Sequence, residues 1–158
     1  MLGQVVLVVG VAVVSIAVLL VLFVIGMRAK SPLALAAVRR ISRLFNPMQM
    51  KTAGKPGAYA SVIEYLGRVS GRHYATPVGA VPAGADFVIS LPYGTGSQWV
   101  RNVLAGGTAT LRSEGATYRV DRPELVPLRE VEDCFSAADG RMHRLFGVDQ
   151  VLRVRRAA

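Results

Sequence analysis

Two polar, glycine-rich segments contain the residues of this sequence whose types and spacing best suit chemistry. The first, residues 67–72 (GRVSGR), combines two glycines with the hydroxyl of Ser70 and the guanidiniums of Arg68 and Arg72. Glycines leave backbone N–H groups accessible, and guanidiniums bind phosphate oxygens in a bidentate geometry, so this segment can hold a phosphate. A hairpin turn with solvated arginines is the alternative interpretation of the same residues.

The second segment, residues 92–99 (PYGTGSQW), follows a predicted strand and opens a predicted helix. Ser97 can cap that helix, whose first N–H groups would bind an anion or the polar edge of a ring. A dinucleotide-binding Rossmann turn does not fit, because Trp99 occupies the place of the third glycine and no second β-α unit follows. Trp99 is therefore either a core residue or the platform for a bound ring.

Other kinds of site lack the residues that they require. Cys134 is the only cysteine, and His73 and His143 are far apart and have no carboxylate at ligand spacing, so we expect no metal and no disulfide framework. The sequence contains no G-x-S-x-G nucleophile motif and no paired carboxylates in the predicted strands, which argues against hydrolysis.

The elements that must position the two segments follow from the pattern of the last hundred residues. We predict strands over 59–66, 73–81, 87–91 and 148–156, a short helix over 97–105, a hairpin over 108–120 closed by Glu114-Gly115, and helix over 121–147 broken at Asp139-Gly140. Strands joined by short hairpins, with helices inserted late, predict a mainly β, α+β fold that forms a small antiparallel barrel.

The N-terminal segment is apolar from Leu2 to Ile25 and carries no charge. As a helix it would extend about 36 Å, which exceeds the roughly 30 Å of membrane hydrocarbon. A cleaved signal peptide fits less well, because Arg28 and Lys30 follow the apolar run instead of preceding it. A pair of buried strands fits less well because Gly10 alone does not make a turn. We therefore predict a transmembrane helix within residues 1–27.

The basic residues orient this helix. The first 55 positions contain seven basic residues, and all seven follow the apolar run with no acidic residue among them. The positive-inside rule therefore predicts a single-pass protein of the plasma membrane with its C-terminal domain in the cytoplasm. Residues 56–158 hold twelve basic and ten acidic residues, a net charge of only +2. The charge therefore indicates anionic lipid as a partner and argues against nucleic acid. The sequence indicates no oligomeric state.

Residues 28–57 connect the apolar run to the domain at 58–158. Ser31 and Pro32 can start a helix that Asn46-Pro47 would stop, and residues 51–57 form a linker. Five apolar residues share one face of this helix: Leu33, Ala37, Ile41, Leu44 and Phe45. We expect the helix at 33–45 to lie either on membrane lipid, as part of a lipid contact through residues 1–45, or against the barrel.

Three stretches of the domain resemble one known family. VIEYLGRVSGRHYATPV, VISLPYGTGSQWVRNVLAGG and GVDQVLRV occur in the order and spacing seen in the deazaflavin-dependent nitroreductase family, whose members are also described as reduced-deazaflavin-dependent quinone reductases. The resemblance covers roughly residues 58–156. It implies a split β-barrel that binds the deazaflavin coenzyme F-420 in a groove at its side.

The resemblance also implies roles for individual residues. Arg68, Ser70 and Gly71 correspond to the phosphate-holding turn, where Arg72 adds a second cation. The backbone at Thr76, Pro77 and Val78 would lie along the coenzyme, and Gln98, Trp99 and Asn102 would flank it. Ser90 would lie near the redox-active ring and, with Tyr93, donate to a quinone or nitro oxygen as charge develops there.

The leading hypothesis is a membrane-anchored oxidoreductase that passes a hydride from reduced deazaflavin to a lipophilic quinone or nitro-type acceptor. A side chain cannot donate a hydride, so such a protein must borrow a cofactor. The alternative is a non-catalytic split-barrel module that binds a flavin such as FMN, a heme or a lipid at the membrane. Val69 and Tyr74 favour this alternative, because the family often has cations near these positions.

Overall fold

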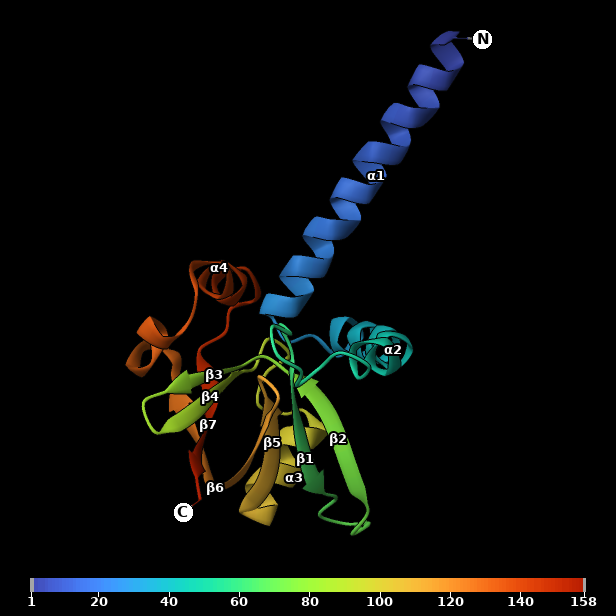
Figure 1. The fold of residues 1–158 in the computed structure, drawn as a ribbon. Coiled ribbons are helices and arrows are strands. Elements are labelled where there is room, and N and C mark those ends of the chain that lie inside the picture. The colour runs from blue at the N-terminus through green and yellow to red at the C-terminus, as the bar shows by residue number, and fades with distance from the viewer. Residues whose placement is uncertain (1, 158) are drawn as a thin grey trace.

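The computed structural model describes residues 2–157 and combines four helices with seven strands (Figure 1). The helices are α1 (Leu2–Arg28), α2 (Pro32–Gln49), α3 (Gln98–Gly106) and α4 (Ala137–Phe146). The strands are β1 (Ser61–Leu66), β2 (His73–Val78), β3 (Ala80–Ala83), β4 (Asp86–Ser90), β5 (Thr108–Ser113), β6 (Ala116–Pro127) and β7 (Gln150–Arg156). Helix α1 projects away from the body that the strands and shorter helices form.

All seven strands belong to one antiparallel sheet with the order β2-β1-β5-β6-β7-β4-β3. Strands β2 and β3 form opposite edges of this sheet, yet only Gly79 separates them in the sequence. The sheet must therefore curl until its two edges meet at Gly79, where the Ser90 N–H donates to the Gly79 carbonyl at 3.1 Å. The predicted mainly antiparallel α+β fold is confirmed as a curled sheet. The single strand predicted over 73–81 is wrong, because it divides at Gly79.

The main core fills the inside of the curl. Helix α3 contributes Val100 and Val103, which are 0 % and 1 % exposed and lie three residues apart on one face of the helix. The helix ends where Gly107 adopts a left-handed φ of 68°. The sheet residues buried with them include Ile63, Phe87, Ile89, Leu111, Val120, Leu152 and Val154. This core fixes the start of α3, and with it Trp99, against the sheet.

The helix predicted over 121–147 is largely wrong. Strand β6 continues to Pro127 through a bulge between Asp121 and Glu124, and two short 3-10 turns follow before α4 begins at Ala137. Helix α4 is not broken at Asp139-Gly140. Asp139 instead accepts hydrogen bonds from the Ser136 backbone and hydroxyl in a capping box, so it starts the helix.

Helix α2 begins as predicted, since the Ser31 hydroxyl accepts a hydrogen bond from the Ala34 N–H and Pro32 occupies the first turn. The predicted stop at Asn46-Pro47 is wrong, because the helix continues through Pro47 to Gln49. Proline lacks an N–H group, but at this position it costs one bond near the end of the helix. The Met50 N–H donates to the Asn46 carbonyl and preserves the last turn.

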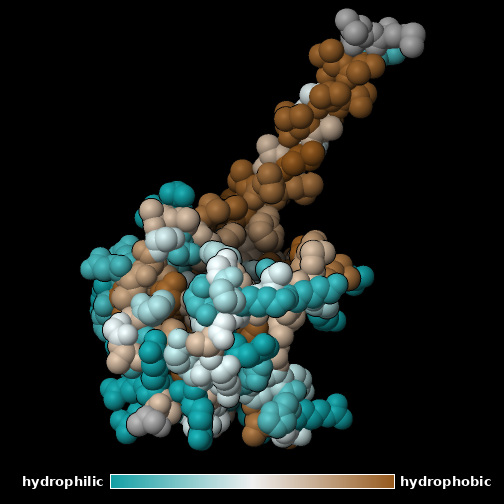
Figure 2. All heavy atoms as spheres, in the orientation of Figure 1, coloured by the Kyte–Doolittle hydropathy of each residue, from teal (hydrophilic) through white to brown (hydrophobic). Residues whose placement is uncertain are grey.

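Helix α1 is long and apolar enough to span a membrane, with a mean hydropathy of 3.3. Figure 2 shows it as an apolar column outside the body. Its end packs on α2 through Met27, Ala34 and Val38. The apolar residues predicted to share one face of α2 do not pack on the sheet: Leu33, Ile41, Leu44 and Phe45 are 51–84 % exposed.

Candidate functional site

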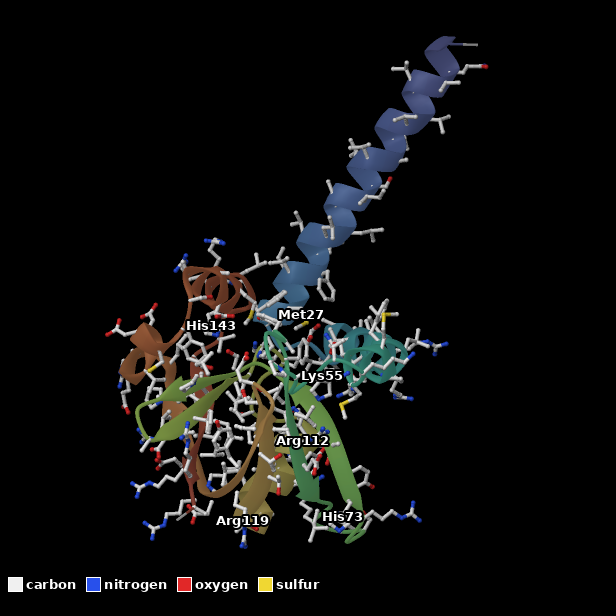
Figure 3. The ribbon with its side chains drawn as sticks, in the orientation of Figure 1. Met27, Lys55, His73, Arg112, Arg119 and His143 are labelled. Carbon is white, nitrogen blue, oxygen red and sulfur yellow. The ribbon has the colours of Figure 1, made fainter. Side chains whose placement is uncertain are left out.

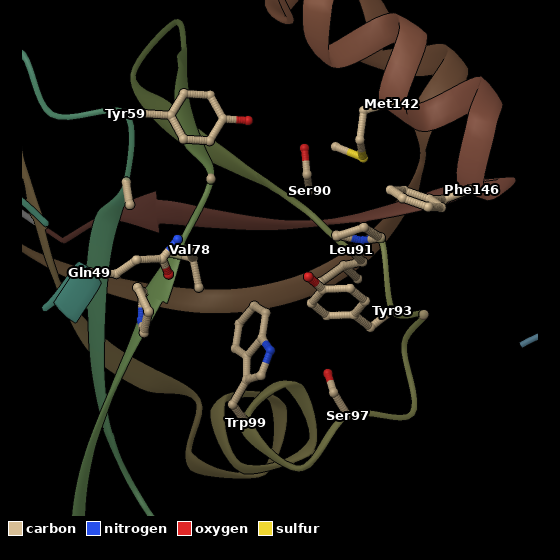
Figure 4. A pocket seen from close by; sticks show the side chains of 15 residues that line it. Gln49, Tyr59, Val78, Ser90, Leu91, Tyr93, Ser97, Trp99, Met142 and Phe146 are labelled. Atoms are coloured by element: carbon tan, nitrogen blue, oxygen red, sulfur yellow. The ribbon is translucent and has the colours of Figure 1, made fainter. Parts of the chain in front are cut away.

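A cavity of about 250 Å³ opens where the two edges of the sheet meet (Figure 4). Residues 77–79 form one wall, and residues 90–94 with Ser97 and Trp99 form the opposite wall. Met142 and Phe146 of α4, Gln49 of α2, and Tyr59 and Ala60 before β1 complete the lining. Each wall comes from a separate part of the sequence, so closure of the sheet at Gly79 is what creates the cavity. We call this space the seam cavity.

Ser90 supplies a hydroxyl at the end of β4, and it forms a hydrogen bond with a buried histidine. The Ser90 Oγ and the His143 Nε2 are 2.8 Å apart, and His143 is only 2 % exposed. The ring of Phe135 packs edge-on against the imidazole, with 4.7 Å between centroids. Among the residues that the structure describes, the His143 Nδ1 has no hydrogen-bond partner. Ser90 thus lines the seam cavity while its hydroxyl forms a hydrogen bond with His143 of α4.

The environment of His143 determines its charge. Burial lowers the pKa of the imidazole, and the carboxylates of Asp139 and Glu132 only partly oppose that effect. The ring is therefore neutral at pH 7 and carries one proton. A proton on Nδ1 would be a buried N–H without an acceptor, whereas a proton on Nε2 donates to Ser90.

Four aromatic side chains stand around the seam cavity: Tyr59, Tyr93, Trp99 and Phe146 (Figure 4). Burial raises the pKa of Tyr93, so its phenol stays protonated and can donate a hydrogen bond. The Tyr59 hydroxyl lies 3.2 Å from the Asp139 carboxylate of α4, which ties the segment before β1 to that helix. Aromatic faces of this kind can border a flat ring system.

The glycine-arginine segment at 67–72 forms the tight turn between β1 and β2. The Gly67 N–H donates to the Arg72 carbonyl and the Gly71 N–H donates to the Gly67 carbonyl, both at 2.8 Å, and Gly71 has a φ of 65°. A side chain at position 67 would clash, because its Cβ would lie 2.6 Å from the Ser70 hydroxyl. The guanidinium of Arg68 donates to the Asn102 side chain of α3 at 2.7 Å.

Helix α3 connects the turn to the seam cavity. Trp99 and Asn102 lie three residues apart and so share a face of α3, where Trp99 lines the cavity and Asn102 holds Arg68. Strand β2 also connects the turn to the seam cavity, because it runs from the turn to Val78. Its length is roughly 17 Å at about 3.3 Å per residue. His73 marks the turn end in Figure 3, opposite the end where His143 and Met27 lie near α1.

The structure places the predicted site residues in three groups. Those that line the seam cavity are Pro77, Val78, Ser90, Tyr93 and Trp99. Those at the turn are Arg68, Ser70, Gly71 and Arg72, joined by Asn102. The remaining two lie outside both sets: the Thr76 hydroxyl is 3.0 Å from the Tyr65 hydroxyl, and Gln98 is exposed. Ser97 occupies the N-cap position of α3 as predicted, but its side chain makes no capping bond and lines the cavity instead.

Sequence reasoning missed the contributions of α2 and α4. The residues not predicted as site residues are Gln49 of α2, Met142, His143 and Phe146 of α4, and Tyr59 before β1, and none of them lies in either glycine-rich segment. No local pattern identifies them. The one available signal was that His143 occupies an apolar position of a helical pattern.

Residues at the end of α1 and directly after it form hydrogen bonds with two walls of the seam cavity and with α4. The Lys30 ammonium donates to the Pro92 carbonyl at 3.1 Å and to the Phe146 carbonyl at 2.9 Å. Arg28 donates to the Arg144 carbonyl at 2.6 Å. Burial lowers the pKa of Lys30, and the charge of Asp149 opposes this. The end of the apolar helix is thus attached directly to the site.

No protein-family model and no curated protein matches this sequence. Among solved structures, an F420-H2 dependent reductase (FDR-A) is 15 % identical, covering 61 % of this chain and 94 % of that one with a TM-score of 0.49. An F420 reductase is 14 % identical, covering 68 % and 92 % with a TM-score of 0.45. A protein of the pyridoxinephosphate oxidase family from Clostridium acetobutylicum, related to general stress protein 26 of B. subtilis, is 9 % identical, covering 70 % and 80 % with a TM-score of 0.48.

Two of these structural neighbours are F420 reductases, and F420 is the deazaflavin coenzyme that the sequence resemblance implied. At TM-scores below 0.5 and identities of 15 % or less, these similarities do not assign an activity to this chain. The site itself has to support the function.

Proposed function

We propose that this protein is a membrane-anchored oxidoreductase that transfers a hydride from reduced F420 to a lipophilic quinone or nitro-type acceptor. The observation that carries the proposal is the seam cavity, where two hydroxyl donors, Ser90 and Tyr93, face a space bordered by the ring of Trp99. Such donors stabilise an oxygen that gains negative charge, as a quinone or nitro oxygen does when it is reduced.

The residues present fit the coenzyme in size and charge. A cavity of about 250 Å³ is smaller than the roughly 300–1,000 Å³ of pockets that enclose a whole ligand, so it suits a ring system whose tail lies outside. The path along α3 and β2 leads that tail to the turn, where Arg72 is exposed and Arg68 is held by Asn102. Trp99 and Val78 would border the ring, and the two arginines would hold the phosphate.

The coenzyme, when bound, supplies the hydride. The side chains of this protein would orient the acceptor and provide the proton donors. Ser90 and Tyr93 would donate to the acceptor oxygen, and Phe146 and Met142 would exclude water from the side of the seam cavity that α4 covers. A tyrosine phenol is protonated at neutral pH, and burial, which raises the pKa of Tyr93, does not change that.

The membrane contact proposed here uses α1 as the span and α2 as an interfacial helix. Helix α2 exposes Leu33, Leu44 and Phe45, and Arg39, Arg40 and Arg43 are exposed on the same helix. Apolar residues with flanking cations suit the boundary between lipid tails and anionic headgroups. The domain would then lie in the cytoplasm beneath the plasma membrane. The seam cavity lies next to the end of α1, so a bilayer-dissolved acceptor would be concentrated near it.

Trp99 is the only tryptophan and provides the test. The full-length protein in detergent is titrated with F420 while the fluorescence of Trp99 is followed, and then supplied with reduced F420 and a menaquinone analogue. We expect saturable quenching and coenzyme-dependent quinone reduction, with weaker coenzyme binding in Arg72→Ala and unchanged binding in Arg155→Ala, an exposed arginine of β7. Absence of both saturable quenching and quinone reduction would contradict the proposal.

The second candidate is a non-catalytic module that binds a flavin such as FMN, a heme or a lipid. One observation favours it: the Arg68 guanidinium is bound to Asn102, and the neighbouring Val69 is 90 % exposed where a cation would strengthen phosphate binding. The visible absorbance spectrum of the protein as isolated distinguishes the two, because flavin, heme and deazaflavin absorb differently. A copurified heme or FMN, with no response to F420, would favour the second candidate.

A further inference from the structure

His143 is a buried polar residue that lies directly behind Ser90. Its Nε2 is 2.8 Å from the Ser90 Oγ, and Phe135 packs against its ring. Within residues 2–157 its Nδ1 has no hydrogen-bond partner. Burying a polar side chain costs free energy unless the side chain forms hydrogen bonds, and His143 is only 2 % exposed. The hydrogen bond with Ser90 is therefore the contact that orients the imidazole ring.

His143 also lines a second cavity of about 380 Å³ between α4, the end of α1 and the 3-10 turns. Arg28, Glu132 and Arg144 line this space with it, and Asp139 lies one turn earlier on α4. Burial disfavours a positive imidazole, and the carboxylates of Asp139 and Glu132 favour one. Burial has the larger effect on the pKa, so the ring stays neutral near pH 7 and one of its two nitrogens carries a proton.

We propose that His143 is a positioning residue that makes Ser90 a hydrogen-bond donor to the seam cavity. The Nε2–H group donates to the Ser90 Oγ, which uses the oxygen as an acceptor and leaves the Ser90 O–H free to point at the acceptor oxygen. This inference rests on the proposed function. It adds that the direction of the Ser90 proton is fixed by His143 of α4, a side chain that does not itself line the seam cavity.

The opposite tautomer would give the opposite result. With the proton on Nδ1, the Nε2 would accept the Ser90 proton, and Ser90 would have no donor left for the seam cavity. That arrangement also buries an N–H group without an acceptor. The two tautomers are mutually exclusive, so a measurement of which nitrogen is protonated decides between them.

The first test needs no coenzyme. Full-length protein labelled with ¹⁵N-histidine in detergent micelles is studied by NMR at pH 7.5, with the exposed His73 as the internal reference. We expect His143 to show a one-bond N–H coupling at Nε2 and the signal of an unprotonated nitrogen at Nδ1. A proton on Nδ1 would overturn the inference whether or not the protein reduces quinones.

The second test compares two replacements in the coenzyme-dependent assay. His143→Phe fills the volume without a donor, His143→Gln keeps an N–H at similar reach, and His73→Gln is the control. We expect His143→Phe to lower kcat about 10- to 100-fold with KM for the quinone unchanged, and His143→Gln to recover most of the loss. Equal losses in the two variants, or no loss in either, would overturn the inference. An inactive wild type would instead refute the proposed function, and the NMR result would still decide the tautomer.

Discussion

Replacing Ser90 with alanine should change stability and rate by separate mechanisms. The substitution leaves the His143 Nε2–H buried without a partner, which costs about 1–3 kcal/mol of folding free energy. In a domain of about 100 residues, each kcal/mol of lost folding free energy lowers Tm by roughly 4–8 °C. The rate effect is larger, because removing one donor to a developing oxyanion lowers kcat by about 10²–10³-fold. KM for the quinone should stay the same, since the donation matters mainly in the transition state.

A matched control separates the two effects. Ser113 is a buried serine whose Oγ is 2.8 Å from the Ser61 Oγ between β5 and β1, and neither serine lines the seam cavity. We expect Ser113→Ala to lower Tm without changing kcat. Steady-state kinetics with reduced F420 and a menaquinone analogue, together with thermal unfolding in detergent, measure both quantities.

The pairing of Ser90 with His143 is tested by the double variant Ser90→Ala, His143→Phe. If His143 acts through Ser90, the double variant should have the kcat of Ser90→Ala alone. Its stability should recover toward that of the wild type, because both partners of the hydrogen bond are then apolar. Multiplicative losses in kcat, or a normal kcat in Ser90→Ala, would refute the reasoning.

Three further predictions concern the attachment, the membrane contact and pH. Lys30→Met removes two hydrogen bonds to the walls of the seam cavity and should lower Tm in thermal unfolding. Lys55 is an exposed lysine, so Lys55→Met should leave Tm unchanged. In a variant with Cys134 replaced by serine, a polarity-sensitive dye attached to Leu44→Cys should report an apolar environment in anionic vesicles. The same dye attached to Lys55→Cys should report an aqueous environment. Equal emission from the two positions would contradict the membrane contact. Because the pKa of His143 is lowered in the folded state, the unfolded state binds more protons just below pH 6.5, so stability should fall with pH from about 6.5 down through the folded pKa. Urea unfolding should show this slope in the wild type and a shallower one in His143→Phe.

Local chemistry made much of the fold predictable. The β5–β6 hairpin was predicted from Glu114-Gly115, and both residues adopt positive φ angles of 50° and 77° at the turn. Ser31 and Pro32 predicted the start of α2 because capping depends on neighbours in sequence. The division at Gly79 was not predictable, because the apolar and β-favouring pattern is continuous across it. Only the closure of the whole sheet assigns β2 and β3 to opposite edges.

The site divides in the same way. Ser90, Tyr93 and Trp99 lie in or beside a glycine-rich segment whose composition pointed to a binding site. His143 was missed because its position depends on where α4 packs, and the pattern of residues 121–147 suggested a helix that would have begun far too early. Asp139 was taken as a helix breaker, whereas its hydrogen bonds with Ser136 make it part of the helix start. Contacts between distant segments decide such positions, and a single sequence does not record them.

The most direct test of the seam cavity as the coenzyme site is the affinity for F420 of a variant that fills it. Gly79 lines the cavity, its φ is not positive, and a Cβ there would meet no atom within 4 Å, so Gly79→Leu should fold normally and block the space. Gly106 lies at the end of α3, outside the cavity, and its φ is not positive and a Cβ there would meet no atom within 4 Å. Gly106→Leu is therefore the matched control. The account predicts saturable F420 binding in the wild type and in Gly106→Leu, and its loss in Gly79→Leu. Equal F420 affinity in all three proteins would contradict it.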